Sequence, residues 1–175
     1  MVIWSRQMFV DAVRLLLFPA MMAFAASTDL FTMKISNRIP LVLAGGFCAL
    51  AALDGMPIAD VGNHLAAGSV VLAVCFAFFS RGWIGGGDAK LAAATALWLG
   101  WAELYEYLLL ASLFGGALTL LLLEFRKCML PPMLANQAWL ARLHERNGGV
   151  PYGIALAAAA LLVYPSTVWM AASGI

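Results

Sequence analysis

Residues 104–125 read LYEYLLLASLFGGALTLLLLEF, a run without Lys, Arg or Asp whose two glutamates, Glu106 and Glu124, lie near its ends. A helix needs about 20 predominantly apolar residues to cross a bilayer, so this run predicts a transmembrane helix. The rest of the chain is similar, because 64% of all residues are hydrophobic, 11% are charged and the mean hydropathy is +0.92. A soluble domain is about half apolar and about a quarter charged. We therefore expect an all-α integral membrane protein.

Five further apolar stretches lie on either side of this run. The six predicted spans are Phe9–Thr28, Ile39–Leu53, Val61–Phe79, Asp88–Trp101, Leu104–Phe125 and Pro151–Ala172. The second and fourth are short, so they begin or end inside the bilayer or the membrane thins around them. The length suits one domain. The sequence thus predicts a single polytopic domain over residues 1–175 with about six transmembrane helices.

The basic residues are confined to alternate connections between these spans. Eight of the ten Lys and Arg residues lie there: Lys34, Arg38, Arg81, Lys90, Arg126, Lys127, Arg142 and Arg146. The other connections hold acidic residues only: Asp54, Asp60, Glu103 and, at the edge of the fifth span, Glu106. Because cytoplasmic loops carry the excess of Lys and Arg, this asymmetry predicts that the first set of loops is cytoplasmic and both termini are outside.

The first span has a rival interpretation. Arg6 and Arg14, the apolar run 15–24 and the small residues around Ala25 also fit a cleavable signal peptide, although Asp11 in the basic part argues against it. Arg14 lies inside the apolar run, where a lone charge is costly. We expect it either to pair with Asp11, three residues earlier on the same helical face, or to extend its head group to the interface. We assign no function to it.

Two aspartates are predicted to lie at one depth on the cytoplasmic side. Asp29 ends the first span and Asp88 follows Gly85-Gly86-Gly87 at the start of the fourth. Ionisable residues at such positions are costly unless they pair or line a water-filled cavity. Taken singly, Asp29 can simply mark the end of a span and Asp88 can cap a helix after a glycine turn. Taken together, they predict a site.

Two carboxylates within hydrogen-bonding range cannot both ionise easily, so the pair holds one proton. Such a pair hydrolyses peptides without a metal or a covalent intermediate. The ionised member takes a proton from water while the protonated member polarises the scissile carbonyl. Asp29 and Asp88 are therefore the predicted catalytic residues, with their individual roles left open.

At these residues the chain resembles the type IV prepilin peptidases, membrane aspartic proteases of the GxGD class. The resemblance rests on three segments in order: Asp29 with Lys34-Ile35-Ser36-Asn37, Gly85-Gly86-Gly87-Asp88-Ala89-Lys90, and Val150-Pro151-Tyr152-Gly153. Ser36 and Ile154 depart from the family pattern, which often has Pro at both positions. All three segments fall on the predicted cytoplasmic face.

The resemblance implies a bacterial inner-membrane enzyme that cuts the basic leader of a prepilin or pseudopilin just before its hydrophobic helix. Longer members carry an N-terminal segment with paired CxxC zinc ligands that is associated with methylation. Cys48, Cys75 and Cys128 form no CxxC pair, so the chain resembles the short form that serves tight-adherence (Flp-type) pili, without a zinc or methyltransferase segment. The expected partners are the prepilin and the lipid bilayer, with a second copy of the chain left open. No cofactor, metal or nucleic acid is expected.

Several further residues are expected to support the site. The backbone of Gly85, Gly86 and Gly87 can approach an extended substrate closely and pair with it by strand addition. Lys90 faces the leader or lipid headgroups, shifts the pKa of the aspartate pair, or simply marks topology. Asn37 caps the second span or holds the Asp29 loop. Pro151, Tyr152 and Gly153 shape the start of the sixth span. Away from the site, His64 and His144 have no convincing metal-ligand set, and residues 137–144 predict a short amphipathic helix on the membrane surface.

Two functions of other kinds remain open. One is a different GxGD intramembrane protease, although Thr28 stands where presenilin-like members usually carry Tyr. The other is a small transporter that uses Asp29 and Asp88 as proton or ion sites. A transporter is expected to place acidic residues nearer the middle of the bilayer.

Overall fold

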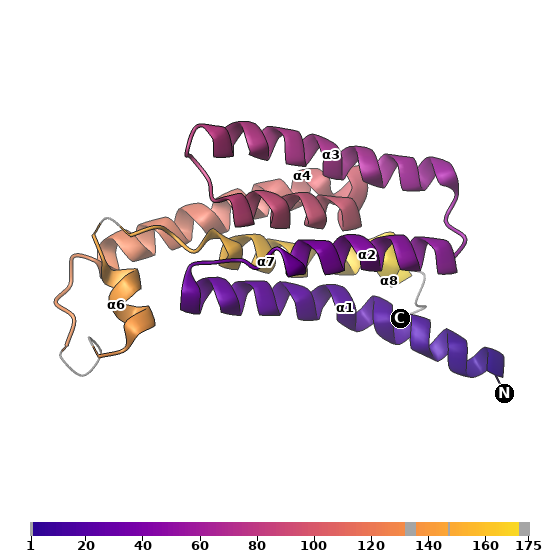
Figure 1. Ribbon diagram of the computed structural model, residues 1–175, viewed down its shortest axis with the longest axis horizontal. Helices are drawn as coiled ribbons and strands as arrows, with labels where there is room; N and C mark the ends of the chain where they lie inside the picture. The colour runs from indigo at the N-terminus through magenta and orange to yellow at the C-terminus, as the bar shows by residue number, and fades with distance from the viewer. Residues whose placement is uncertain (1, 132–135, 147, 172–175) are drawn as a thin grey trace.

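A computed structural model describes residues 2–131, 136–146 and 148–171 of the chain. Every regular element within these ranges is a helix, which confirms the all-α prediction. The elements are α1 (Val2–Thr32), α2 (Arg38–Leu53), α3 (Ile58–Ser80), α4 (Gly86–Phe125), α6 (Ala138–His144), α7 (Tyr152–Val163), the 3-10 helix η1 (Tyr164–Ser166) and α8 (Val168–Ala171). Figure 1 shows the long helices lying along one common direction, with α6 set apart at one end of the bundle.

The lengths of the helices agree with a membrane protein. Three apolar stretches of helix are long enough to cross a bilayer: Val10–Thr32, Ile58–Ser80 and Gly86–Phe125. Two shorter apolar helices, Arg38–Leu53 and Tyr152–Ser166, lie between and after them. Many large apolar side chains on these helices, such as Leu41 and Leu120, are exposed on the surface. Lipid is the solvent that such a surface requires.

Helix α4 contains the turn that the sequence predicts between its fourth and fifth spans, although at a different residue. Gly100 has φ 71° and ψ −168°, a conformation outside the helical region that favours glycine. A Cβ at this position would also lie 2.9 Å from the ring of His64. Figure 1 shows that the chain folds back here, so both ends of α4 point toward the same end of the bundle.

The predicted sixth span is wrong in one respect, because it is not one continuous helix. It is divided into α7, the 3-10 turn η1 and the short α8. Pro165 lies in this turn, and proline has no backbone N–H to continue an α-helix and clashes with the preceding turn. The predicted end of this span at Ala172 lies outside the described residues.

An aromatic core lies in the half of the bundle away from α6. The Trp98 indole donates to the carbonyl of Leu43 at 2.8 Å, and the Trp169 indole donates to that of Trp98 at 2.8 Å. Both indoles are fully buried and lie with ring centroids 5.3 Å apart. These bonds join α2, α4 and α8 into a fixed scaffold.

Arg14 lies at the edge of this core and is 5% exposed. Its guanidinium bonds Asp11 at 2.7 Å, so of the two expected arrangements the structure shows the ion pair. It also makes two bonds to Asp54, which follows α2, one of them from Nε at 3.1 Å. The sequence analysis missed this second partner. A buried Arg held by two carboxylates is a structural clamp between α1 and the α2–α3 connection.

Candidate active site

Asp29 lies in the last turn of α1 and is held by the backbone of α7. Its side chain is buried, with the residue 5% exposed. The amide N–H of Gly153 donates to Asp29 Oδ2 at 2.7 Å, across 124 positions of sequence. A hydrogen bond from N–H to a carboxylate is among the stronger bonds in proteins. One oxygen of Asp29 is therefore fixed in place by the start of α7.

Asp88 lies in the first turn of α4, as the sequence predicts. Its Oδ2 lies against Gly85, where a Cβ would be only 2.7 Å away. Its Oδ1 is buried and has no hydrogen-bond partner among the described residues. Buried carboxylate oxygens normally have a partner, so this oxygen is available to a proton or to another hydrogen-bonding group.

Ile35 connects the two aspartates. A Cβ on Gly153 would lie 2.7 Å from Ile35 Cδ1, and a Cβ on Gly87 would lie 3.0 Å from Ile35 Cβ. Ile35 therefore touches both the residue that holds Asp29 and the residue that precedes Asp88. The two carboxylates are close enough for their charges to interact. The structure thus brings together the two residues that topology alone placed at one depth.

The glycine triplet differs in conformation from the expected extended strand. Only Gly85 is extended, with φ −73° and ψ 145°, while Gly86 and Gly87 already belong to α4. Their lack of a side chain serves close packing, because a Cβ on Gly86 would lie 3.2 Å from the ring of Phe79 and one on Gly87 would meet Ile35. The carbonyl of Gly85 already accepts the amide N–H of Ala89 at 3.0 Å, so the three glycines do not form a free strand edge in this structure.

Asn37 and Lys90 are brought together by the fold. Asn37 stands at the N-cap position of α2, but its side chain makes no capping bond, so the expected side-chain cap is wrong. Its Oδ1 instead accepts a hydrogen bond from Lys90 Nζ at 2.8 Å. This bond ties the loop after Asp29 to the helix that begins near Asp88.

The segment 151–153 closes the site from the side of α7. Pro151 directly precedes the first helical residue, Tyr152. The ring of Tyr152 packs on Gly115, where a Cβ would lie 2.6 Å away, and its hydroxyl lies 3.2 Å from Thr119 Oγ1. Tyr152 thus fixes α7 against the second half of α4, and Gly153 is the residue of this motif that touches Asp29. The sequence analysis quoted Ile35 only as part of a motif and missed Thr119, because both act through contacts with distant segments.

Helix α6 packs across the end of α1 beside the site. It forms over nearly the residues predicted, but the expected burial of its apolar side chains in lipid is only partly right, since Leu143 is buried within the protein. Arg142 donates to the carbonyl of Phe31 at 2.8 Å, and Trp139 packs edge-on against the ring of Phe31. Arg126 is buried and donates to the carbonyls of Leu143 and Gly149, at 2.9 and 2.7 Å.

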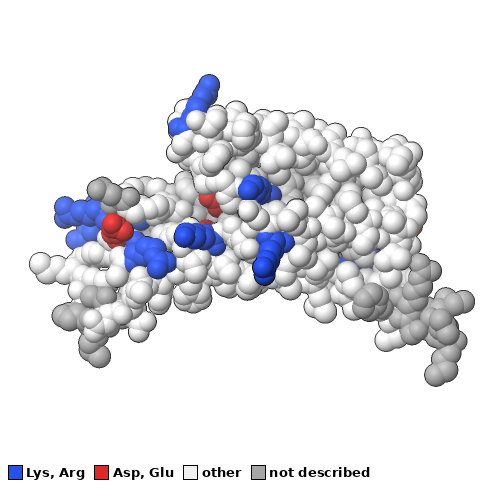
Figure 2. All heavy atoms as spheres, in the orientation of Figure 1, with Lys and Arg blue, Asp and Glu red and all other residues white. Residues whose placement is uncertain are grey.

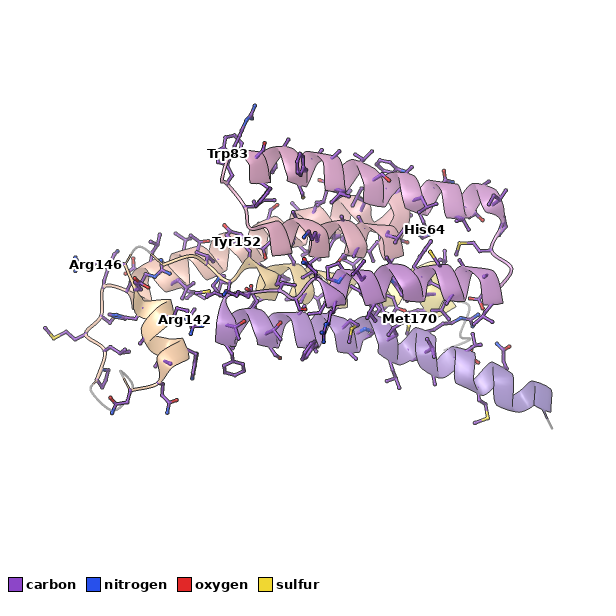
Figure 3. All side chains as sticks on the ribbon, viewed as in Figure 1. His64, Trp83, Arg142, Arg146, Tyr152 and Met170 are labelled. Carbon is purple, nitrogen blue, oxygen red and sulfur yellow. The ribbon has the colours of Figure 1, made fainter. Side chains whose placement is uncertain are left out.

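Charge gathers at this end of the molecule. Figure 2 shows Lys and Arg side chains around the end of the bundle where α4 begins, with a small acidic patch recessed among them. Figure 3 shows Tyr152 and Arg142 toward this end and His64 toward the other.

The two histidines bond to backbone carbonyls. His64 Nδ1 is 2.8 Å from the carbonyl of Leu97, and His144 Nε2 is 2.7 Å from that of Cys128. Within the described ranges no three His, Cys, Asp or Glu side chains are arranged to hold a metal ion.

These features define a class: an all-helical protein of membrane character with two acidic side chains brought together at the basic end of its bundle. Comparison with known proteins gives the family. The model of the type IV leader peptidase family matches residues 16–120, which include Asp29 and Asp88. The chain belongs to the type IV leader peptidase family.

Two curated relatives are named "Prepilin leader peptidase/N-methyltransferase", one from Aeromonas salmonicida strain A449 and one from Aeromonas salmonicida. Each is 35% identical over 126 residues, a stretch that covers 66% of this chain and 43% of the relative. The chain thus matches less than half the length of these relatives. No solved structure matches it significantly.

Proposed function

We propose that this protein is an aspartic endopeptidase that removes the leader peptide of type IV prepilins or pseudopilins, using Asp29 and Asp88 to activate water. The observation that supports this is the contact of Ile35 with both Gly153, which bonds Asp29, and Gly87, which precedes Asp88. Membership of a leader peptidase family supports the reaction, and the relatives bear that activity in their names.

The hydrogen bonds of the two carboxylates differ, and this limits where the shared proton resides. Asp29 Oδ2 accepts the Gly153 N–H, so this oxygen is not the protonated one. Asp88 Oδ1 has no partner among the described residues and is available to carry the proton or to bind water. The geometry therefore supports an arrangement in which Asp88 Oδ1 and the free oxygen of Asp29 face the reacting groups.

The reaction follows from this arrangement. The ionised carboxylate takes a proton from water as the water oxygen attacks the scissile carbonyl, and the protonated carboxyl hydrogen-bonds the developing oxyanion. Collapse of the tetrahedral intermediate breaks the C–N bond, and the departing amine receives a proton from the pair. The substrate must be extended at the cut, because a helix hides its carbonyls in internal hydrogen bonds.

The charges support a location for the site at the cytoplasmic face of a bacterial inner membrane. Lys34 lies in the loop after α1, and Arg38 and Lys90 lie near the starts of α2 and α4. By contrast, Asp54 and Asp60 lie at the other end of α2 and α3. Cytoplasmic connections carry the excess of Lys and Arg. A prepilin presents its basic leader to that compartment, and the tight-adherence (Flp-type) prepilins are the substrates to test first.

The experiment is co-expression of a Flp-type prepilin with the wild-type chain, Asp29→Asn or Asp88→Asn, followed by the size of the pilin in the membrane fraction. Asn keeps the size of Asp but cannot carry the charge. Wild type should shorten the precursor, both variants should leave it intact, and the matched control Asp60→Asn, an exposed residue of α3, should cut normally. Cleavage by either site variant at the wild-type rate contradicts the two-carboxylate mechanism.

A further inference from the structure

An apolar groove of about 470 Å³ lies between α2, α3 and the first half of α4. Its walls include Leu41 of α2 and Leu65 and Leu72 of α3, which are 70%, 48% and 46% exposed. Its floor is formed by the small residues Ala93 and Ala94. Figure 1 shows α2 and α3 on either side of α4 at this level. The groove is therefore open to the surroundings of the helices, which are lipid.

One end of the groove, which we call its mouth, is polar. Asn37 and Lys90 line it, and Lys90 Nζ donates to Asn37 Oδ1 at 2.8 Å. A Lys ammonium has three N–H donors and no acceptor, and an Asn amide whose oxygen is already bonded offers its two N–H donors. Both side chains are exposed. The mouth thus presents hydrogen-bond donors and a positive charge, which is the composition of a site for an anion such as phosphate.

The length of the apolar groove, measured from its polar mouth, can be compared with the thickness of the bilayer. Lys90 and Leu97 both line the groove, and seven residues of helix rise about 10 Å. The groove thus extends about a third of the way across a hydrocarbon core of about 30 Å. The apolar groove, with Lys90 and Asn37 at its mouth near the membrane surface, is complementary to one class of ligand, an anionic amphiphile with an acyl chain.

We propose that this groove binds an anionic phospholipid, with its phosphate on Lys90 and Asn37 and one acyl chain between α2 and α3. Arg38, the first residue of α2, adds a second cation beside Asn37. Asp88 does not line the groove, and at about 100° per residue it lies on the opposite side of α4 from Lys90. The lipid site is thus separate from the proposed catalytic pair, and it braces α2 against the helix that carries Asp88.

The test is native mass spectrometry of the delipidated full chain with phosphatidylglycerol or phosphatidylcholine of identical acyl chains. Wild type should retain one phosphatidylglycerol in preference to phosphatidylcholine. Lys90→Gln should lower that preference about tenfold, since a charge-assisted bond is lost. Ser69→Phe, which places a ring in the groove, should abolish retention of both lipids. The matched controls are Lys127→Gln and Ser112→Phe, both at exposed positions away from the groove.

The lipid retention of these variants supports or overturns the proposed lipid site. Retention by Ser69→Phe equal to that of Ser112→Phe overturns the lipid site, as does a loss of preference in Lys127→Gln as large as in Lys90→Gln. If Ser69→Phe fails to insert, Leu65→Trp fills the groove from an exposed position of the same helix. Unchanged lipid retention together with loss of prepilin binding in these variants would assign the groove to the apolar helix of the substrate instead.

Discussion

Gly153→Ala tests the geometry of the site without touching either carboxylate. The added Cβ would lie 2.7 Å from Asp29 Oδ2 and 2.7 Å from Ile35 Cδ1. Neither atom can remain there, so Asp29 must move away from the Gly153 N–H that it accepts at 2.7 Å. A hydrogen bond to a charged group contributes about 1.5–3 kcal/mol. If that energy positions Asp29 for reaction, its loss slows cleavage about ten- to hundredfold.

The assay is the rate at which a co-expressed prepilin is shortened, measured against the amount of enzyme inserted in the membrane. Gly116→Ala is the matched control, because it makes the same substitution in α4 where nothing lies within 4 Å of the new Cβ. Both variants gain up to about 1 kcal/mol of helix propensity, so a general effect of Ala on folding affects them alike. Equal cleavage rates for Gly153→Ala and Gly116→Ala refute the argument that the α7 amide positions Asp29.

A second variant separates the two clashes. Ile35→Val removes Cδ1, which is one of the two atoms that the Gly153→Ala methyl meets. The double variant should therefore recover part of the rate that Gly153→Ala loses, which a double-mutant cycle measures as a coupling between contacting residues. Strict additivity of the two losses would mean that Ile35 does not confine this position.

Three more outcomes are expected. Gly86→Val should impair cleavage while the protein still inserts, because even a Cβ there lies 3.2 Å from the ring of Phe79; unchanged cleavage of the prepilin would contradict this. Arg14→Met removes the buried guanidinium that bonds Asp11 and Asp54 and should destabilise the fold by about 2 kcal/mol, the scale of a hydrogen bond to a charged group. This loss is seen as a lower melting temperature in detergent, whereas Lys127→Met, at an exposed ion pair, should change it little. EDTA should leave cleavage unaffected because the proposed chemistry uses two carboxylates, and a loss restored by added zinc would count against it.

The sequence predicted the helices well and their ends less well, for physical reasons. Hydropathy detects long apolar runs, so α2 and α3 lie within about three residues of their predicted spans. Helix α1 begins seven residues before its predicted start, because its first turns contain polar residues. It does not register backbone conformation. The reversal in α4 occurs at Gly100 rather than beside Glu103, and the Pro165 turn inside the last span was missed although the proline was visible.

The residue types of the candidate site could be chosen from the sequence, but the contacts between them could not. Asp29 and Asp88 stood out because acidic residues at the edge of a membrane are costly without a purpose. The Gly153–Asp29 bond joins residues 124 positions apart, and the Lys90–Asn37 bond joins residues 53 positions apart. No local pattern encodes either pairing. For the same reason Asn37 was expected to cap α2 or to hold the Asp29 loop, both local roles, whereas its side chain bonds to Lys90 of α4.

The glycines at the site are better explained by what they bring together than by flexibility. Gly87 and Gly153 belong to motifs 66 positions apart, yet each lacks the Cβ that would collide with the same side chain, Ile35. A single apolar residue in the loop after α1 thus sets how closely α4 and α7 approach that helix. Because Asp29 and Asp88 lie on two of these three helices, the packing around Ile35 sets the distance between their carboxylates. The candidate acidic pair can stay aligned without a covalent link, because a side chain larger than hydrogen at either glycine would collide with Ile35.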